Sequence, residues 1–501
     1  MPSTNNPQAT TPLLDALTDC ANKPHAPFYA PGHKRGVGIS PSLAESFGEA
    51  VFRADLPELP ELDNLFAPLG AIREAQQLAA AAFGAAHTWF LVNGSTAGVM
   101  AAILATCGTG DKIILPRNVH QSALAGIILS GAIPIFLNPE YDDLIDIAHS
   151  ITPDSVAEAL HHHPDAKAVM MVYPTYYGVC GDVGAIASLA HQHNIPLLVD
   201  EAHGPHFTFH PGLPASALSA GADLTVQSIH KVLGAMTQAA MLHSQGTRVE
   251  IDRVSKALQL LQSTSPSYLL LASLDAARQQ MALHGEELMT LSLQLATSAR
   301  ARISKIPGLS VIDPVATTPG FVDLDLTRLT VTVSGLGLTG FEADEILAQH
   351  GVIAELPSLQ NLTFIISLGN TQADIEQLVQ AFTTLSTKYR RSRKPLYVNS
   401  FARIINNPKV GNIPQISPRE AFFSQTETLP VEKTAHRISA ELVCPYPPGI
   451  PVLMPGEVIT PAALDYLQQI LAQGGSITGC SDRTIMTLKV IAKTNAPTNH
   501  Y

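Results

Sequence analysis

The amino-acid sequence predicts an α/β fold in which a mainly parallel sheet is covered by helices on both faces. Short apolar runs alternate with helical segments between residues 70 and 243, which is the pattern of parallel strands joined by helices. The 501 residues are 46% hydrophobic, and at roughly 150 residues per domain this length predicts about three domains. In such folds ligands bind at the carboxyl ends of the strands.

Each element of the alternating region is indicated by its own residues. The Ala-rich segment 70–83 is followed by Gly84, which predicts a helix with a glycine C-cap. A strand at 88–92, a loop at 93–96 and a helix that continues to Cys107 follow. Apolar runs and helical patterns further along predict strands at 112–115, 133–137, 168–172, 196–200, 223–227 and 239–243, and helices at 122–130 and 184–193.

The flanking regions differ in character. The first 45 residues are Pro-rich and, around Pro27–Gly36, lack helical or strand periodicity, so we expect an extended arm. A helix at 274–306 precedes a smaller α+β pattern, with strands at 320–326, 329–333 and 363–368 and a helix at 340–350. We expect a domain boundary at residues 388–395. The proline-rich stretch 444–457 beyond it is unfavourable for a helix and for a central strand. The predicted parts are an arm (1–45), a large domain (46–275), a small α+β domain (276–392) and a C-terminal domain (393–501).

Charge and cysteine content narrow the class of protein. The net charge is −12, and we interpret the one basic cluster, residues 389–394, as a solvated linker. We therefore do not expect a nucleic-acid partner. The five cysteines are widely spaced, which indicates neither a disulfide framework nor a zinc site and favours a reducing, cytoplasmic location. No secretory signal is recognisable at the N-terminus, and no apolar run reaches the about 20 residues of a membrane span.

Lys231 and Asp200 point to a cofactor. Asp200 ends one apolar run, in Leu-Leu-Val-Asp200, and Lys231 follows another, in Leu224-Thr-Val-Gln-Ser-Ile-His-Lys231. Pyridoxal phosphate needs a lysine amine to form a Schiff base with its aldehyde and a carboxylate to keep its ring nitrogen protonated. A surface lysine and a helix-capping aspartate are the alternative for either residue alone. Their joint placement at two strand ends predicts a pyridoxal phosphate site and no metal.

Further residues would complete that site. Gly94, Ser95 and Thr96 lie between a strand and a helix, where backbone N–H groups and hydroxyls bind phosphate, although Ser and Thr are also ordinary helix caps there. Ser228 and His230 flank the lysine and would add donors to the same phosphate.

Two histidines are candidates for contacts with the cofactor ring. His120 follows a strand end and could stack on the ring, and His203 could reach the phenolic oxygen of the ring or a substrate carboxylate. A structural, hydrogen-bonded role is the competing interpretation for both. The run His161–His163 is not expected to bind a metal, because consecutive helical positions point in different directions.

The ordered motifs resemble the bacterial ornithine/lysine/arginine decarboxylases. They are Pro31-Gly-His33-Lys34, Asn93-Gly-Ser-Thr96, Arg117-Asn-Val-His120, Pro174-Thr-Tyr-Tyr-Gly178, Asp200-Glu-Ala-His203-Gly, Gln227-Ser-Ile-His-Lys231 and Pro445-Tyr-Pro-Pro-Gly-Ile-Pro451, spread over residues 25–480. The resemblance implies a fold type I, aspartate-aminotransferase-like enzyme with a family-type C-terminal domain. It further implies that Lys231 is the Schiff-base lysine, Asp200 the pyridinium partner, His120 the stacking residue, and Ser95, Thr96, Ser228 and His230 the phosphate contacts.

The expected activity follows from this resemblance. It is decarboxylation of arginine, lysine or ornithine to agmatine, cadaverine or putrescine, in polyamine or diamine synthesis. Family members are at least homodimers, and this chain resembles the short class without an N-terminal regulator-like domain. One alternative is another fold type I reaction, such as transamination or lyase chemistry. The other is that the protein is a non-catalytic homologue that binds the cofactor.

The identity of the basic substrate stays open at this level. A distal ammonium or guanidinium needs a carboxylate partner, and guanidinium prefers a planar, bidentate one. The candidates are Glu441, Glu457 and Asp63. Each could equally be a surface or structural acid.

Overall fold

The computed structural model describes residues 6–312, 318–390, 414–446 and 450–493. The chain divides into two units by its internal contacts. The first consists of residues 1–106, 196–294 and 367–369, and the second of residues 107–195, 295–366 and 370–501.

The seven strands of the main sheet come from both units. The first unit contributes, in spatial order, β1 (His87–Leu91), β10 (Ala240–Ser244), β9 (Leu224–Gln227) and β8 (Leu197–Asp200). The second contributes β6 (Ala168–Val172), β2 (Lys112–Pro116) and β3 (Ile133–Leu137). The pairs β8–β9, β2–β6 and β2–β3 are parallel, whereas β10 is antiparallel to both neighbours. The predicted mainly parallel sheet is therefore confirmed.

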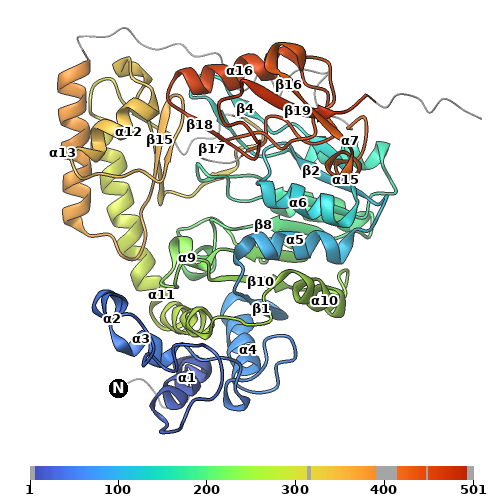
Figure 1. The fold of residues 1–501 in the computed structure, drawn as a ribbon. Coiled ribbons are helices and arrows are strands. Elements are labelled where there is room, and N and C mark those ends of the chain that lie inside the picture. The colour runs from blue at the N-terminus through green and yellow to red at the C-terminus, as the bar shows by residue number, and fades with distance from the viewer. Residues whose placement is uncertain (1–5, 313–317, 391–413, 447–449, 494–501) are drawn as a thin grey trace, which may run out of the picture. The chain divides into compact units, whose positions relative to one another are not determined.

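The strands are covered on both faces, as their apolar composition requires. Every residue of β8, β9 and β10 is buried, which is typical of strands between two helical layers. In the first unit α5 (Gly94–Thr106) and α10 (Ile251–Leu261) lie side by side (Figure 1). A Cβ at Gly98 would lie 2.7 Å from the side chains of both Leu91 and Val226, so glycine there lets α5 approach the sheet closely.

The predicted helices and strands agree closely with the structure in this region. The helix α4 (Ala71–Phe83) ends at Gly84, which has φ +74 in the left-handed region, as the C-cap prediction required. The other helices that follow the sheet strands or flank them are α6 (Gln121–Ser130), α7 (Pro153–His162), α8 (Val183–Gln192), the short α9 (Ile229–Val232) and the long α11 (Tyr268–Ile303).

The predicted α+β pattern after residue 306 is also present, in the second unit. A four-stranded antiparallel sheet has the order β11 (Ser310–Val311), β13 (Arg328–Thr332), β15 (Asn361–Ile365) and β14 (Leu356–Pro357). It packs against α12 (Gly340–Ala348) and α13 (Gln372–Tyr389) around a core that includes Val331, Leu362 and Phe382.

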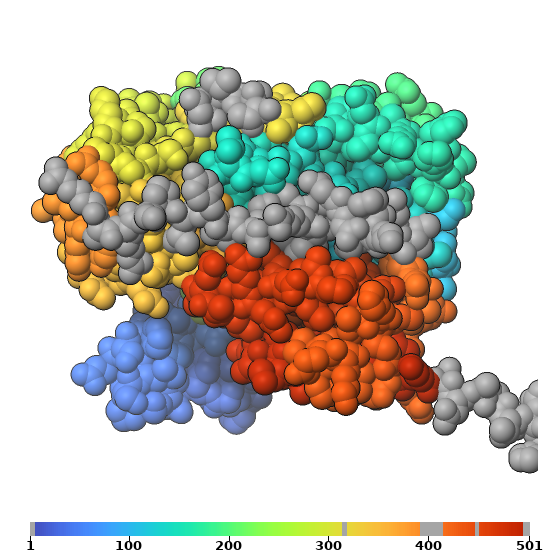
Figure 2. Space-filling view, turned by 90° about the horizontal axis from the view of Figure 1, so that it is seen from above, coloured from blue at the N-terminus to red at the C-terminus, as the bar shows by residue number. Residues whose placement is uncertain are grey.

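The C-terminal part of the second unit has its own apolar core. Its elements are α15 (Pro418–Phe423), α16 (Pro461–Ala472) and the two-stranded sheets of β16 (Thr426–Pro430) with β19 (Thr487–Ile491) and β17 (Cys444–Tyr446) with β18 (Ser476–Thr478). These residues, orange to red in Figure 2, form one continuous surface region. In the proline-rich stretch β17 pairs on one side only, in agreement with the expectation that it forms no central strand, and residues 447–449 lie outside the described part.

The expectation of an extended arm was wrong for part of the N-terminus. Residues 12–22 form α1 (Pro12–Asn22), and α2 (Pro41–Phe47) and α3 (Glu49–Ala54) follow. Leu13, Leu17, Cys20 and Ala21 are the buried residues of α1. This i, i+4, i+7, i+8 spacing places them on one helical face, so the signal was present in the sequence. No helix or strand is assigned between residues 23 and 40, but the extended interpretation fails there too, because residues 32–38 form consecutive turns in which Lys34, Arg35 and Gly36 have positive φ.

Smaller differences concern element boundaries. The helix α5 begins at Gly94, so Ser95 and Thr96 lie in its first turn and not in the predicted loop. The helix α11 begins six residues before the predicted 274 and runs across the proposed boundary at 275/276. Most of the proposed boundary at 388–395, and of the basic cluster 389–394, lies outside the described residues.

The short strand pairs are β4 (Tyr141–Asp142) with β5 (Ile147–Ala148) and β7 (Val179–Cys180) with β12 (Asp323–Leu324). In the described part of the chain, no helix combines the length and apolarity needed to cross a bilayer.

Candidate active site

Lys231 lies in the short helix α9, which directly follows β9 in the first unit. Its Nζ is 2.9 Å from Nε2 of His203, a buried residue three positions beyond the end of β8. Because a lysine ammonium only donates hydrogen bonds, Nε2 of a neutral His203 accepts in this pair and Nδ1 carries the proton. The strand order of the first unit thus brings together the lysine and the histidine that the sequence placed at two strand ends.

Asp200 is the last residue of β8 and only 6% exposed. Its Oδ1 accepts a hydrogen bond from the backbone N–H of Ala202 at 3.2 Å. Within the described chain, no protein group donates to Oδ2. Oδ2 is therefore available to accept a hydrogen bond from a bound group that presents an N–H.

The first turn of α5 supplies the groups expected to hold a phosphate. Gly94 has φ +74, and the N–H groups of the first turn of a helix have no partner within the helix. Ser228 is fully buried, and its Oγ donates to Oγ of Ser95 at 2.7 Å. This hydrogen bond joins the segment before the lysine to the start of α5, so two of the predicted phosphate contacts converge on one helix N-terminus.

His230 and Thr96 lie on the same two segments. Burial and the charge of Lys231 lower the pKa of His230, which keeps its imidazole neutral at pH 7. Thr96 is exposed in the first turn of α5. Contact of either residue with a phosphate stays a prediction.

His120 belongs to the second unit and is the N-cap of α6. Its Nδ1 accepts from the backbone N–H of Ser122 at 3.2 Å and lies 2.8 Å from Oγ of the same residue. These bonds fix the ring, and they leave Nε2 as the nitrogen that carries the proton when the ring is neutral. Stacking of this ring on a cofactor stays a prediction.

The residues of the first unit fit pyridoxal phosphate. The end of β8 supplies a buried carboxylate with one oxygen available to accept, and the segment after β9 supplies an amine. The first turn of α5 supplies hydroxyl and N–H donors at a helix N-terminus. These are the three kinds of group that the cofactor's aldehyde, ring nitrogen and phosphate require. Among the described residues, no group of three or more His, Cys, Asp or Glu side chains is arranged to hold a metal.

Asp63, one of the three acids predicted for the substrate, caps α4. Its carboxylate accepts from the backbone N–H groups of Asn64, Leu69, Gly70 and Arg73 at 2.8–3.3 Å. Burial raises the pKa of Asp63, but these four donors outweigh burial and the net shift is downward. The carboxylate is therefore held ionised by the start of the helix.

Glu441 and Glu457 are both buried in the second unit. Glu441 accepts from the backbone N–H groups of Ser481 and Lys489, each at 2.7 Å. Glu457 forms a bidentate ion pair with Arg117, in which Nη2 and Oε2 are 2.8 Å apart, and also accepts from the backbone N–H of Met454 at 3.0 Å. Both acids thus have protein partners for both oxygens, and their binding of a substrate cation stays a prediction.

Two features of the structure were not anticipated from the sequence. Arg117, the first residue of the Arg117–His120 motif, is 1% exposed and is the partner of Glu457. Glu201, next to Asp200, is fully buried and accepts hydrogen bonds from Ala217 and Gln227. A second acid at the end of an apolar strand was the available signal for Glu201.

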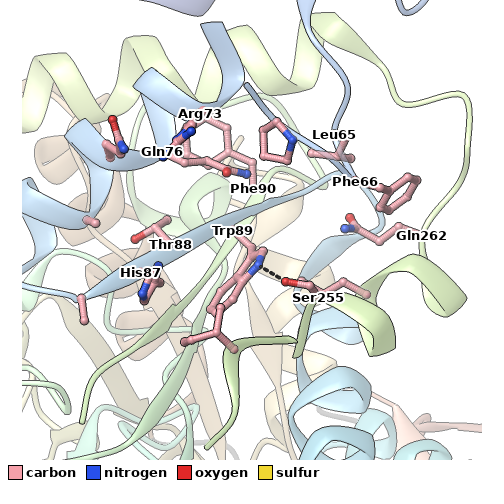
Figure 3. Close-up of a pocket in the computed structure, with 16 residues that line it drawn as sticks. Leu65, Phe66, Arg73, Gln76, His87, Thr88, Trp89, Phe90, Ser255 and Gln262 are labelled. Carbon is pink, nitrogen blue, oxygen red and sulfur yellow. Dashed lines mark hydrogen bonds between the residues drawn. The ribbon is translucent and has the colours of Figure 1, made fainter. Parts of the chain in front are cut away.

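A pocket of about 250 Å³ lies in the first unit around the edge strand β1. Figure 3 shows Arg73, Gln76 and Trp89 among its lining, with Trp89 Nε1 donating to Ser255 Oγ at 3.1 Å. Thr88 also lines it, whereas Lys231, Asp200 and His203 do not.

Comparison with known proteins agrees with this geometry. The family model "Orn/Lys/Arg decarboxylase, major domain" matches residues 11–324, and the model of the C-terminal domain of the same family matches residues 400–482. An arginine decarboxylase of Halalkalibacterium halodurans is 41% identical over 496 residues, which cover 98% of this chain and 99% of that protein.

More distant relatives support the same fold. Lysine decarboxylase LdcA of Pseudomonas aeruginosa is 27% identical over 91% of this chain and 75% of its own length. A solved structure of lysine decarboxylase A from the same organism has a TM-score of 0.82 at 25% identity, covering 96% of this chain and 80% of that one. A ureidoglycine-glyoxylate aminotransferase of Bacillus subtilis, at 14% identity and a TM-score of 0.51 over 64% of this chain and 86% of that one, shares the aminotransferase-like fold.

The family matches, the near full-length relative and the amine, carboxylate and phosphate-binding groups of the first unit lead to one conclusion. The chain belongs to the Orn/Lys/Arg decarboxylase family and is a pyridoxal phosphate-dependent decarboxylase of basic amino acids.

Proposed function

We propose that the substrate is L-arginine and that the products are agmatine and carbon dioxide. The observation that carries this proposal is the 41% identity to an arginine decarboxylase along nearly the whole of both chains. The lysine decarboxylase relative is only 27% identical and three quarters covered. Sequence divergence of this size is ample to alter the part of a pocket that distinguishes a guanidinium from an ammonium.

Four residues of the first unit have defined roles in this proposal. Lys231 attaches the cofactor through its amine, and Asp200 holds the protonated ring nitrogen with Oδ2. Ser95 and Ser228, already bonded to each other at 2.7 Å, hold the phosphate together with the first turn of α5. When bound, pyridoxal phosphate supplies an electron sink for the pair released as carbon dioxide leaves.

Lys231 and His203 also suit the proton transfer that completes the reaction. After decarboxylation the α-carbon needs one proton. The 2.9 Å contact between Nζ of Lys231 and Nε2 of His203 would position the lysine ammonium to donate that proton, which leaves the lysine as a neutral amine. General acid groups within hydrogen-bond distance contribute about 10²–10⁴ in rate.

Recognition of the guanidinium group is proposed for the predicted acids Glu441, Glu457 and Asp63. A guanidinium pairs best with a carboxylate that accepts two parallel hydrogen bonds. Each of the three is already engaged, so substrate binding would have to share an oxygen with a backbone N–H or with Arg117. Separate Asp63→Asn, Glu441→Gln and Glu457→Gln variants test them, because loss of a substrate carboxylate raises KM for arginine more than it lowers kcat.

Product analysis tests the proposed substrate directly. Protein reconstituted with pyridoxal phosphate is incubated separately with arginine, lysine and ornithine, and the amines are identified by mass spectrometry. Agmatine from arginine, at a kcat/KM at least about tenfold above that for the other two, is expected. A tenfold preference corresponds to about 1.4 kcal/mol of differential transition-state binding.

Other products would contradict the proposal in distinct ways. Cadaverine or putrescine as the main amine would keep the family reaction and change the substrate. A keto acid without carbon dioxide would indicate transamination. No product from protein that retains the yellow cofactor absorbance would favour a non-catalytic homologue.

We also propose a homodimer or larger homo-oligomer, a cytoplasmic location and the domain boundaries 45/46, 275/276 and 392/393. Resemblance to the family supports the assembly. All five cysteines lie in the described part of the chain and none is in a disulfide, which supports a reducing compartment. Light scattering of the purified protein tests the assembly, and limited proteolysis tests the boundaries. A monomer at micromolar concentration, or stable fragments cut elsewhere, would contradict them.

A further inference from the structure

Four buried polar side chains form a row of hydrogen bonds across the first unit. Glu201 Oε2 accepts from Gln227 Nε2 at 2.8 Å, Gln227 Oε1 is 3.1 Å from His243 Nε2, and His243 Nδ1 is 2.7 Å from Thr88 Oγ1. The first three side chains are fully buried and Thr88 is 5% exposed. The row starts directly after β8 and passes through β9 and β10 to β1, which are consecutive neighbours in the sheet.

Once Glu201 is ionised, each hydrogen bond of this row has only one possible donor and one possible acceptor. Burial raises the pKa of Glu201 to about 8, and above that pH both of its oxygens accept, from Ala217 N at 2.7 Å and from Gln227. Burial also lowers the pKa of His243 to about 3, so its imidazole is neutral and carries one proton. Gln227 must then present its oxygen to His243, whose Nε2–H donates, and Nδ1 accepts from the hydroxyl of Thr88.

The position of Glu201 connects this row to the cofactor residues. Consecutive residues at a strand end point to opposite faces of the sheet, so Glu201 lies behind the face that presents Asp200. Its partner Gln227 precedes Ser228, which bonds Ser95, and stands four residues before Lys231. One side-chain hydrogen bond therefore ties the segment that carries Asp200 to the segment that carries the lysine.

We propose that Glu201 is a positioning residue for the cofactor: its carboxylate, through Gln227, holds the ends of β8 and β9 so that Asp200 and Lys231 address one bound pyridoxal phosphate. This inference rests on the proposed roles of those two residues. Glu201 touches neither cofactor nor substrate. It acts through the backbone of Asp200 and through the Gln227–Ser228 segment.

Exchanging the Glu and Gln side chains at positions 201 and 227 tests this positioning role, because the two side chains have nearly the same size and shape. In Glu201→Gln the new amide keeps its oxygen on the N–H of Ala217 and turns its NH₂ toward the NH₂ of Gln227, so two donors meet unless Gln227 turns over and faces its NH₂ toward His243. His243 then has to move its proton to Nδ1. In Gln227→Glu two carboxylates face each other. The double variant Glu201→Gln/Gln227→Glu restores every donor and acceptor, because the new amide at position 201 donates to the new carboxylate at position 227, which also accepts from His243.

The measurement is the affinity of the apo-protein for added pyridoxal phosphate at about pH 9, where Glu201 is ionised. Binding is followed by absorbance, and ¹⁵N NMR of His243 identifies the protonated nitrogen. A mismatched buried hydrogen bond costs about 1–3 kcal/mol, roughly 5- to 150-fold in a binding constant. Each single variant is therefore expected to bind the cofactor about tenfold or more weakly. The double variant is expected within about threefold of the wild type, with the proton of His243 on Nε2.

Several outcomes would overturn the inference. Unchanged cofactor affinity in Glu201→Gln, despite a lowered Tm, would reduce Glu201 to a purely structural role. Single variants that weaken binding without recovery in the double variant would show that complementarity is not the cause. If the single variants do not fold, the double variant still decides, since weak cofactor binding by a folded double variant contradicts the proposal.

Failure of the proposed function has a different signature. Wild-type protein would then bind pyridoxal phosphate without releasing an amine, or Lys231→Ala would keep the covalent absorbance. Neither result concerns residues 201 and 227. Normal amine formation by the wild type together with no rescue in the double variant would refute only the role of Glu201.

Discussion

Buried acids in the two units of this protein differ in how fully other protein groups satisfy their oxygens. In the first unit, Asp200 ends a buried strand and has a protein donor for only one of its oxygens among the described residues. In the second unit, Glu441 and Glu457 are about as deeply buried, yet backbone N–H groups and Arg117 occupy both oxygens of each. Burial alone therefore does not show whether a carboxylate of this chain has an oxygen available for a ligand.

The difference has a simple physical basis. An ionised carboxylate taken out of water must recover its lost hydration from hydrogen bonds or an opposite charge. Glu457 recovers it from Arg117, and Glu441 from the backbone around β18 and β19. Asp200 recovers only part of it from the protein, and the protonated ring nitrogen of the cofactor would provide the remainder.

The largest expected effect is at the lysine. Lys231→Ala removes the amine that attaches the cofactor, and we expect amine formation to fall by about 10³ or more. The yellow absorbance of reconstituted protein is expected to disappear on gel filtration. Lys256→Ala, at an exposed position of α10, is the matched control and should behave as wild type. Retained absorbance in Lys231→Ala would place the attachment site elsewhere.

A second prediction concerns the carboxylate with an oxygen to spare. Asp200→Asn keeps the size of the side chain but removes the charge that keeps the ring nitrogen protonated. A carboxylate in hydrogen-bond contact shifts a pKa by about 1–3 units, so kcat is expected to fall by about 10- to 1000-fold while the cofactor still binds. Steady-state kinetics with a parallel cofactor titration measure both quantities. Wild-type turnover in this variant would contradict the role assigned to Asp200.

The matching variant in the second unit should affect stability first. Glu457→Gln leaves Arg117 buried without an opposite charge, and removal of one partner of a buried pair costs about 3–5 kcal/mol. We expect a cost near the lower limit, since the amide oxygen still accepts one hydrogen bond. Denaturant unfolding measures it, with the exposed Asp465→Asn on α16 as control. If Glu457 also binds the substrate, as proposed above, KM for arginine rises at temperatures where the variant remains folded.

The smallest effect is a pH dependence of stability. Burial raises the pKa of Glu201 to about 8, against 4.5 in the unfolded chain. The folded state therefore retains a proton that the unfolded state has released. The contribution of this group to the free energy of unfolding is full below pH 4.5 and is lost as the pH rises to about 8.

This pH dependence can be isolated by a difference measurement. Free energies of unfolding are measured from about pH 4.5 to about pH 9 for the wild type and for Glu201→Gln, whose amide does not titrate. The wild type is expected to lose stability relative to the variant across this window and to run parallel to it above about pH 8. A constant difference throughout would mean that Glu201 is ionised at all these pH values in the folded protein.

Much of the fold was predictable because its signals are local. The alternation of apolar runs and helical segments placed most of the strands of the main sheet to within a residue or two, and Gly84 marked the end of α4. The error at α1 was a missed period of 3.6, since Leu13 and Leu17 carry it plainly. Boundaries such as the start of α11 were less accurate, because packing decides how far a helix extends.

Some features of the candidate site were likewise predictable from the sequence, and others became visible only in the tertiary structure. The sequence by itself determined the cofactor chemistry, because Asp200 ends a strand, Lys231 and the Ser95 turn follow strands, and the carboxyl end of a strand can be located from hydrophobic pattern alone. Only the tertiary structure showed which acids are already engaged, since Arg117 and Glu457 are 340 residues apart in the chain. It likewise revealed the row from Glu201 to Thr88, because β1 reaches its place beside β10 through strand order, which no local pattern of residues encodes.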